Sequence, residues 1–542
     1  MSVACALHSA RCDRDLLIRI LLDPSFGISA HVLEQPKPGP YAARQADRAA
    51  AFVEGRPFRA LTDMGNAYLL VDLHGPDILH CYPHKSWYVW DGCRWVRDDG
   101  HRIEKMVKDA PVHLREEAGR VGDEKLADRI KAWAQRSEGS ERLRAIARVA
   151  QSEVPVEASA LDADSMLLNV ANGTLDLRTG SLRAFNRDDL ITKQGKVDFD
   201  PEAKCPMFMA FIARIMGYPT AAEEITLDAT ELRRRKRAAI RLISFLQRAL
   251  GYSLTGRTDE QVFFIAHGTG QNGKSTLLEI VRAAFGDYAR STDTQTFAAN
   301  DRRDASGPTE NIARLQGARL VTAVENSEDQ RLDEKLIKQI TGGDKITARH
   351  LYQASFEFVP TFKVWIAANS LPDIRGQDPA IWRRPKAIPF EVTIPKEERD
   401  TTLKDRIIAD ELSGVLAWMV RGCLKWQRRG LKPPAEVEAY TDQYRGDMDI
   451  IGDFVKTVCK VEQGTCCPAK DLWDRYEQWC HDNGEQPLKQ RTFGRRLRER
   501  GIRSEPVWSS IEKKVVRYYS GISIADESGP PPAACSAPEI PF

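Results

Sequence analysis

The sequence predicts an α/β protein, because a strand-like run, a glycine-rich loop and a helical pattern follow one another between residues 261 and 286. The letters QVFFIAHGTGQNGKST place Gly268, Gly273, Lys274 and Ser275 at the fixed positions of the spacing GxxxxGK(S/T). The next letters, LLEIVRAAFG, carry apolar residues at helical spacing and end in glycine. This order predicts a loop that opens onto a helix N-terminus, where anions are favoured.

Each residue type in this loop suits a nucleotide triphosphate. Glycines allow backbone N–H groups to curl around a phosphate. Lys274 would lie against the β- and γ-phosphates, and the Ser275 hydroxyl would bind Mg²⁺. We therefore expect ATP and Mg²⁺ as cofactors. The expected nucleotide contacts are Gly268, Thr269, Gly270, Gln271, Asn272, Gly273, Lys274, Ser275 and Thr276.

Three later segments carry candidate catalytic residues. The apolar run ARLVTAV ends at Glu325, where a carboxylate could polarise water and hold Mg²⁺. The run FKVWIAA ends at Asn369, whose amide could orient the attacking water. The letters IWRRPKAIPF present Arg383 and Arg384, and paired arginines here could reach the γ-phosphate of a neighbouring subunit. The expected catalytic set is Lys274, Glu325, Asn369 and Arg384, with Ser275 and Glu325 as metal ligands.

Two segments suggest contacts with DNA. The runs ITARHLYQ and SFEFVPT predict a hairpin that carries Lys345, Arg349 and His350, and cations on a protruding loop suit a phosphate backbone. Near the C-terminus, helical patterns are followed by QRTFGRRLRERG and by strand-like VVRYYSGISI, which together predict a winged helix. Arg491 and Arg495 would then contact DNA from a recognition helix. A solvated basic helix is the alternative.

Two other patterns have structural interpretations that we favour. Trp87, Trp90 and Trp95 could stack on bases, but such a stripe is more often the packed face of a sheet. Asp162 and Asp164 have the spacing of a two-metal polymerase or primase site, but the apolar strand that would hold them in register is missing. A capped turn is the simpler interpretation of this pair.

Composition sets the bounds of the function. A net charge of +2 means that any nucleic-acid surface must come from local clusters. The 11 cysteines are scattered, and residues 1–10 hold too short an apolar stretch for export. No apolar run approaches the ~20 residues of a membrane span. We therefore expect a soluble cytoplasmic chain with reduced thiols and no membrane partner.

The patterns divide the chain into seven segments. These are residues 1–60, without assignment; 61–204, an α+β domain; 205–255, a helical collar; 256–395, the P-loop ATPase core; 396–446, a helical cap; 447–524, the winged helix; and 525–542, a disordered tail.

The text from about Asp63 to Tyr444 resembles the helicase part of satellite-phage and plasmid primase–helicases, a superfamily-three family that includes the poxvirus primase–helicase. The matching letters are TDMGNAYLLVDLHG, WYVWDGCRW, LLNVANGTLDLRTG, GTGQNGKST, LDEKLIKQITGGDKITARHLYQ, FEFVPTFKVWIAANSLP and IWRRPKAIPF. This resemblance implies an AAA-related ATPase that assembles into a ring, usually a hexamer, around one DNA strand and moves 3′ to 5′.

The family's motifs map onto residues already singled out here. Lys274 and Ser275 fall in Walker A, Glu325 in Walker B, Asn369 at the sensor position, Arg384 at the arginine finger, and Arg349 and His350 on the DNA-gripping hairpin. The sequence departs from the family pattern at Asn326, where many members carry a second carboxylate, and at Pro385, which leaves Arg383 and Arg384 open as the finger. Residues 1 to about 60 are too few for the primase domain of larger relatives, so we expect a helicase without its primase and with a separate primase as a possible partner.

The expected function is therefore that of a ring-forming, ATP-dependent DNA helicase that acts in the replication of a phage, a plasmid or an integrated mobile element. Single-stranded and duplex DNA would be its partners. Two alternatives remain open: an origin-binding initiator that uses ATP as a switch, and a primase acting through Asp162 and Asp164.

Overall fold

The computed structural model describes residues 12–26, 29–35, 38–53, 60–299, 309–324, 331–352, 354–462, 464–509 and 514–525. The chain forms two compact units, Met1–Leu161 and Asp162–Phe542, and each is described by itself. Their boundary falls inside the 61–204 segment that the sequence suggests as one domain. The small sheet β4–β6 therefore belongs to the second unit.

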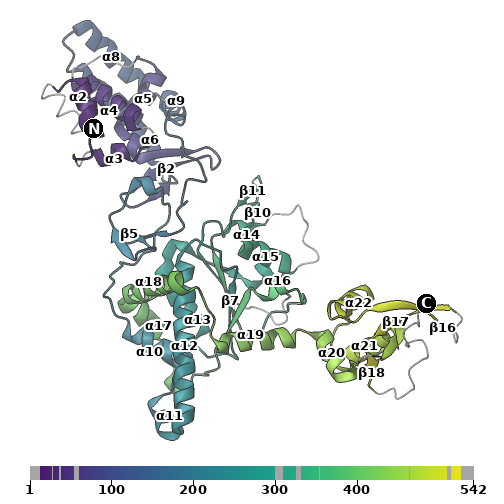
Figure 1. Ribbon diagram of the computed structural model, residues 1–542. Coiled ribbons are helices and arrows are strands. Elements are labelled where there is room, and N and C mark those ends of the chain that lie inside the picture. Colours follow the sequence, from purple (N-terminus) through teal and green to yellow (C-terminus); the bar gives the residue numbers. More distant parts are fainter. Residues whose placement is uncertain are drawn as a thin grey trace. The chain divides into compact units, whose positions relative to one another are not determined.

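The first unit is mostly helical (Figure 1). Its short sheet β1–β2–β3 is antiparallel, with Leu79 opposite Tyr88 and Tyr88 opposite Arg97. Trp95 is buried and meets Trp90 edge to face at 5.7 Å between ring centroids, as expected of a packed face. The elements are α2 (Arg14–Leu22), α3 (Ala30–Leu33), α4 (Pro38–Val53), α5 (Asp63–His74), η2 (Gly75–Asp77), β1 (Ile78–Cys81), β2 (Ser86–Trp90), β3 (Trp95–Arg97), α6 (Arg102–Val107), α7 (Asp109–Ala118), α8 (Glu124–Ser137) and α9 (Ser140–Ala150).

A five-stranded parallel sheet forms the centre of the second unit, in the order β13–β7–β12–β9–β8. Its strands are β7 (Phe263–His267), β8 (Ala289–Asp293), β9 (Leu320–Val324), β12 (Lys363–Ala368) and β13 (Pro385–Pro389). The predicted α/β class is confirmed by this sheet. The order could not be read from the sequence, and it places β12 between the strand before the P-loop and the strand before Glu325.

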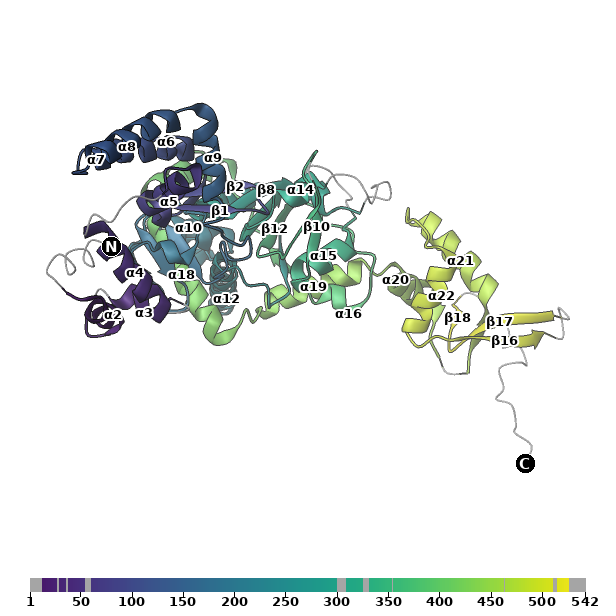
Figure 2. The same ribbon diagram turned by 90° about the horizontal axis from the view of Figure 1, so that it is seen from above.

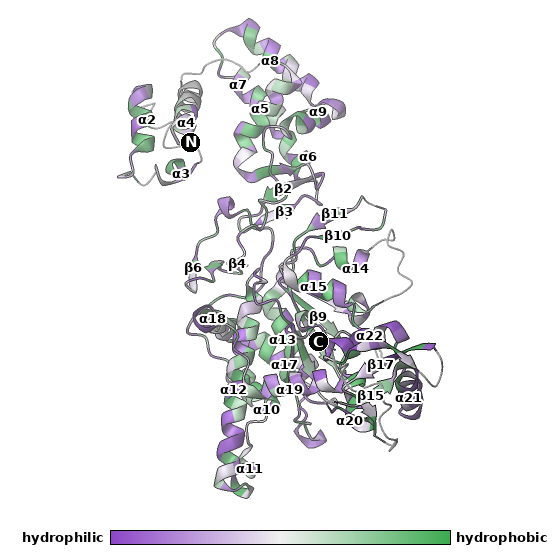
Figure 3. Cartoon of the chain, turned by 45° about the vertical axis from the view of Figure 1, so that its right-hand side comes forward, coloured by the Kyte–Doolittle hydropathy of each residue, from purple (hydrophilic) through white to green (hydrophobic). Residues whose placement is uncertain are grey.

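Both faces of this sheet are covered, because alternate side chains of each strand enter different cores. Phe264 of β7 and Trp365 of β12 stack at 4.3 Å between ring centroids. They point into a core with α10 (Pro206–Ile215), α12 (Ala229–Leu254), α13 and α18 (Leu412–Arg429). Phe263 and Ile366 point into the opposite core with α14, α15 and α16. Figure 3 shows the apolar residues gathered on β9 and α13. These helices are α13 (Lys274–Phe285), α14 (Glu310–Ala313), α15 (Glu334–Gly342) and α16 (Pro379–Trp382).

The predicted collar and cap segments pack against each other through α12 (Ala229–Leu254) and α18 (Leu412–Arg429). The two backbones touch at Gly251 and Gly422, where an added Cβ would overlap the facing main chain. Glycine at both positions allows this close crossing. In Figure 1, α11 lies at the far end of α12. Other elements of this part are β4 (Leu167–Val170), β5 (Gly173–Asp176), β6 (Ser181–Arg183), η3 (Arg187–Asp189), α10 (Pro206–Ile215), α11 (Ala221–Thr226), η4 (Gly286–Tyr288), η5 (Thr294–Phe297), η6 (Lys396–Glu398), α17 (Leu403–Arg406), the π-helical turn η7 (Ile407–Glu411) and α19 (Ala435–Asp447).

The C-terminal region has its own apolar core, centred on Phe454, Tyr476 and Phe493. The antiparallel strand pair β16–β17 follows α21 and α22, and Figure 2 shows these two strands side by side. The elements are α20 (Ile450–Val458), β14 (Cys459–Lys460), β15 (Cys466–Pro468), α21 (Ala469–Asp482), α22 (Gln490–Glu499), β16 (Ser504–Ser509), β17 (Lys514–Ser520) and β18 (Ser523–Ile524).

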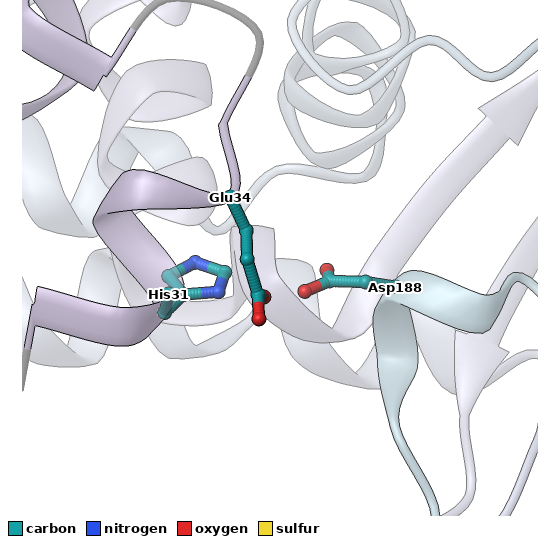
Figure 4. A group of neighbouring side chains, drawn as sticks. All are labelled: His31, Glu34 and Asp188. Atoms are coloured by element: carbon teal, nitrogen blue, oxygen red, sulfur yellow. The ribbon is translucent and has the colours of Figure 1, made fainter. Parts of the chain in front are cut away.

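The cysteines and the candidate cation ligands do not form sites that organise the described part of the fold. Cys466 is disulfide-bonded, so the expectation of uniformly reduced thiols is wrong at this position, while eight described cysteines are free. Figure 4 shows three possible cation ligands, His31, Glu34 and Asp188. His31 and Glu34 belong to the first unit and Asp188 to the second, so we assign no metal site to them. Within the described ranges, no helix combines the length and apolar character needed to cross a bilayer.

Two buried cations join the amino-terminal edge of the parallel sheet to the end of α12. The Arg319 guanidinium donates to the Leu254 carbonyl at 2.9 Å and to the Leu167 carbonyl at 2.6 Å. Lys363, only 1% exposed, donates to the carbonyls of Thr255, Arg257 and Thr361, the last two at 3.1 and 3.2 Å. Burial lowers the pKa of Lys363 well below its ordinary value, and three carbonyl oxygens offset part of that cost.

We expect Lys363→Met to lower the free energy of unfolding by about 2 kcal/mol, because three buried carbonyl oxygens lose their shared donor. Urea denaturation of the full chain, followed by tryptophan fluorescence, measures this change. Lys338→Met is the matched control, since Lys338 makes a partly exposed ion pair with Asp378 at 2.8 Å that contributes at most about 1 kcal/mol. Equal stability of the two variants would contradict the assignment.

Candidate nucleotide site

The loop between β7 and α13 has the conformation that its glycines predict. Gly270 and Gly273 have φ angles of +101° and +81°, and Gln271 between them also lies in the left-handed region at +51°. A Cβ at Gly268 would overlap the Phe390 carbonyl oxygen and the Asn272 side-chain amide. Position 268 therefore has no room for a larger residue. The loop ends where α13 begins at Lys274.

Lys274 and Asn369, 95 positions apart in the chain, meet at this loop. Lys274 is 6% exposed, and its ammonium donates to the Gly268 carbonyl at 2.5 Å, to Asn272 Oδ1 at 3.0 Å and to Asn369 Oδ1 at 3.1 Å. Oxygen atoms of the loop and of Asn369, which follows the neighbouring strand β12, thus hold the ammonium in place. A phosphate oxygen would find this ammonium at the helix N-terminus, where the helix dipole also favours negative charge.

The strand order explains how Asn369 reaches Lys274. β12 and β7 run parallel with Ala368 opposite His267, so the residues that follow them emerge side by side. His267 strengthens the contact: its Nε2 lies 3.0 Å from the Asn369 backbone carbonyl, and its Nδ1 lies 2.6 Å from the Tyr440 hydroxyl.

The predicted metal ligands are placed only in part. Val324 ends β9 opposite Ala367 of β12, so the chain leaves that strand beside the one that carries Asn369. Glu325 follows at once but lies outside the described residues. Ser275 is exposed in the first turn of α13. The Ser275 hydroxyl follows a buried lysine and a loop that has no space for a Cβ at Gly268. Together these groups suit a nucleotide phosphate with its magnesium ion. Thr269 is exposed and Thr276 half-buried.

The two candidate arginine fingers have different environments. Arg384 is 6% exposed, donates through Nε to Thr341 Oγ1 at 2.9 Å, and also bonds the Ala380 carbonyl. Burial lowers the pKa of this guanidinium. Arg383 is exposed and donates to Gln261 Oε1 at 2.6 Å. The finger role, assigned to Arg384 from the sequence with Arg383 left open, stays a prediction.

The predicted hairpin forms between β10 (Ile346–Ala348) and β11 (Phe356–Phe358), with Thr347 opposite Glu357. Lys345 is exposed at its base, while Arg349 and His350 are half-buried. The His350 ring lies 3.1 Å from Glu310 Oε2 and stacks on Phe356, so it is partly engaged within the chain. Tyr352, which sequence reasoning missed, is 98% exposed at the tip with a φ of +61°.

The arginines of α22 divide between two faces. Arg491, Arg495 and Arg498 are exposed, at the i, i+4, i+7 spacing of one helical stripe. The buried Arg496 donates to the Arg375 carbonyl, and Arg500 pairs with Asp449. The DNA contacts predicted at Arg491 and Arg495 stay predictions.

The acidic pair of the primase alternative has structural partners. Asp162 Oδ1 accepts from the Thr192 backbone N–H at 2.8 Å, and the Asp164 carboxylate pairs with Arg178 at 2.8 Å. These partners support the capped-turn interpretation.

His267 and Tyr440 are the other residues that sequence reasoning missed. His267 stands directly before Gly268, which is a weak signal. Tyr440 lies 173 positions away on α19, and no local pattern could have indicated it.

Models of known families match three parts of the chain. A family model described as D5 N terminal like matches residues 67–217, and one described as Poxvirus D5 protein-like matches residues 446–521. These two matches support a poxvirus D5-like primase–helicase family for this chain. The resemblance predicted from the sequence is thereby confirmed. A third model, of a family of unknown function, matches residues 266–384 of the D5-like chain, which include the loop.

Viral relatives of this D5-like chain carry the name "Putative helicase". That of Acanthamoeba polyphaga mimivirus is 28% identical over 349 residues, covering 60% of this chain and 34% of the relative. That of Frog virus 3 is 25% identical over 397 residues, covering 62% and 40%. That of Sputnik virophage is 28% identical over 153 residues, covering 28% and 20%. The chain thus spans well under half the length of these relatives.

Solved structures also match this chain, at low identity and with TM-scores below 0.5. The apo structure of the NrS-1 C-terminal region (305–718) is 12% identical, has a TM-score of 0.45, and is matched over 86% of this chain and 100% of that chain. A second form of that region has a TM-score of 0.43.

We expect Gly268→Ala to weaken ATP binding by about a hundredfold, because relieving the overlap must shift the loop and cost about two charge-assisted bonds to phosphate. Isothermal titration calorimetry with ATP and Mg²⁺ measures the loss. Gly446→Ala is the control, since an added Cβ there meets nothing within 4 Å. Binding by Gly268→Ala as tight as by this control would contradict the role of the loop.

Proposed function

We propose that the chain is an ATP-dependent DNA helicase that assembles into a ring, in hexamers, and acts in the replication of a phage, a plasmid or an integrated mobile element. The observation that carries this proposal is the meeting of the Lys274 ammonium and the Asn369 amide at a glycine loop, 3.1 Å apart. The names of the viral relatives support it. Movement from 3′ to 5′, cytoplasmic location and a separate primase partner follow from the family resemblance and belong to the same proposal.

Hydrolysis would use residues at the ends of neighbouring strands. Mg²⁺, held by Ser275 and Glu325, supplies charge neutralisation at the phosphates when bound. Lys274 neutralises further charge on the β- and γ-phosphates. Glu325 accepts a proton from the attacking water, and Asn369 orients that water. The bond from γ-phosphorus to the bridging oxygen breaks as the bond to water forms.

An arginine from the next subunit would complete the site. Arg383 is the better placed of the pair, because it can leave Gln261 without uncovering a buried partner. Movement of Arg384 would instead deprive Thr341 and Ala380 of a buried hydrogen-bond partner. Assembly would therefore control the rate of hydrolysis.

DNA contacts would come from two regions. The hairpin offers Lys345, Arg349 and His350 to the backbone of a threaded strand, and the exposed Tyr352 ring could stack on a base. The C-terminal region would act as a winged helix, with Arg491 and Arg495 of α22 toward duplex DNA.

The exposed arginine stripe of α22 also favours a second candidate, an origin-binding initiator that uses ATP as a switch. Both functions bind duplex DNA, but only a helicase displaces a strand. A strand-displacement assay with ATP therefore separates them.

We expect turnover of ATP to rise more steeply than protein concentration, to increase with single-stranded DNA, and to accompany strand displacement. Arg383→Ala should lower turnover by about a thousandfold without weakening ATP binding. Arg384→Ala should instead lower thermal stability, because Thr341 and Ala380 lose a buried partner. Steady-state phosphate release, nucleotide titration and thermal melting measure these effects. A monomer whose turnover ignores DNA would contradict the proposed function.

We expect Tyr352→Ala to weaken binding of single-stranded DNA by about tenfold, because one base loses a stacking partner. Fluorescence anisotropy with a labelled oligonucleotide measures this loss. Tyr82→Ala is the control, because Tyr82 is also exposed but lies in the first unit. Unchanged affinity of the Tyr352 variant would exclude stacking at the hairpin tip.

A further inference from the structure

A cavity of about 710 Å³ lies among α10, α12, α19 and the segment after β13, within the size range of small-molecule sites. Its walls come from α10 and the residues that follow it, from α11 and α12, from the end of β13 and the segment after it, and from α19. They include Arg214, Tyr218, Arg235, Val392, Thr393 and Tyr440.

The segment after β13 is shared between this cavity and the loop. The Ile394 backbone N–H donates to the Gln271 carbonyl at 3.0 Å, and Asn272 Nδ2 donates to the Phe390 carbonyl at 3.0 Å. Residues 392 and 393, between these two anchors, line the cavity. A nucleotide with its phosphates on the loop would therefore have this space within reach of its nucleoside part.

Tyr440 connects the cavity to the phosphate end of the site through two hydrogen bonds. The Asn369 carbonyl can only accept, so His267 Nε2, at 3.0 Å, must carry a proton and donate. In the neutral ring Nδ1 is then an acceptor, and the Tyr440 hydroxyl donates to it at 2.6 Å. Burial raises the pKa of Tyr440, which keeps this hydroxyl protonated. The chain of donors thus runs from Tyr440 to His267 to Asn369.

This series of hydrogen bonds holds Asn369 at its backbone oxygen, in addition to its side-chain oxygen. The side-chain oxygen of Asn369 accepts from Lys274, while its backbone oxygen accepts from His267. A shift of Tyr440 would therefore reach the amide that faces the γ-phosphate position without any movement of the sheet.

We propose that Tyr440 and His267 are positioning residues, which hold Asn369 against Lys274 and tune hydrolysis to the presence of a nucleoside in the cavity. This inference rests on the proposed function. Neither side chain takes part in the chemical step. Their contribution is the orientation of Asn369, so their loss should slow turnover and leave phosphate binding intact.

The test compares His267→Phe, Tyr440→Phe and the double variant with wild type, using ATP and inorganic tripolyphosphate as alternative substrates. Each single change should lower kcat for ATP by about fivefold to tenfold, the effect of one hydrogen bond, with KM within about twofold. The kcat of the double variant should be no lower than that of His267→Phe, because either change breaks the same series of hydrogen bonds. The preference for ATP over tripolyphosphate should fall by the same factor.

Asp442→Asn is the control, since Asp442 is exposed on the same helix. Thermal melting shows whether each variant is folded, and Tyr440→Phe, which removes one oxygen atom, decides the question if His267→Phe does not fold. Wild-type turnover in the single variants, multiplying effects in the double variant, or an unchanged substrate preference would each overturn the inference. A wild-type chain without ATP turnover would instead refute the proposed function itself.

Discussion

The parallel pairing of β12 between β7 and β9 is the constraint on which the site depends. Because all three strands run in the same direction, the residues that follow them emerge at one edge of the sheet. Lys274 and Asn369 meet there although the sequence separates them widely. Asn369 is held there by the strand that it follows, and Lys274 by the loop and the start of α13.

β12 is held at both ends. At its amino end, Lys363 is buried among the carbonyl oxygens of Thr255, which caps α12, and of two loop residues, while at its carboxyl end Asn369 bonds to the P-loop lysine. Two buried cations thus bracket one strand. The three carbonyl oxygens offset part of the desolvation cost of Lys363, and one of them, that of Thr255, caps a helix end that needs a donor in any case.

Local signals were enough to predict the loop, the strands that flank it, and Lys274, Asn369 and the hairpin. The spacing of glycines and the ends of apolar runs carry that information directly. The order of the strands is not local, because a crossover can place the next strand on either side of its predecessor. The different environments of Arg383 and Arg384 depend on Thr341, a contact between distant segments. The partnership of His267 with Tyr440 depends likewise on how α19 packs against β13. Glu325 lies outside the described residues, so its role rests on the sequence pattern.

The helix that carries Tyr440 continues almost directly into the C-terminal region. α19 is about 20 Å long, and Thr441 ties it to the sheet edge by accepting from the Ala387 N–H at 3.1 Å. Only Met448 and Asp449 separate it from α20, and Asp449 caps that helix through the Gly452 N–H. The connection therefore has little slack. A small tilt of α19 against the sheet would therefore move the C-terminal region with it, whereas a flexible linker would not transmit the motion.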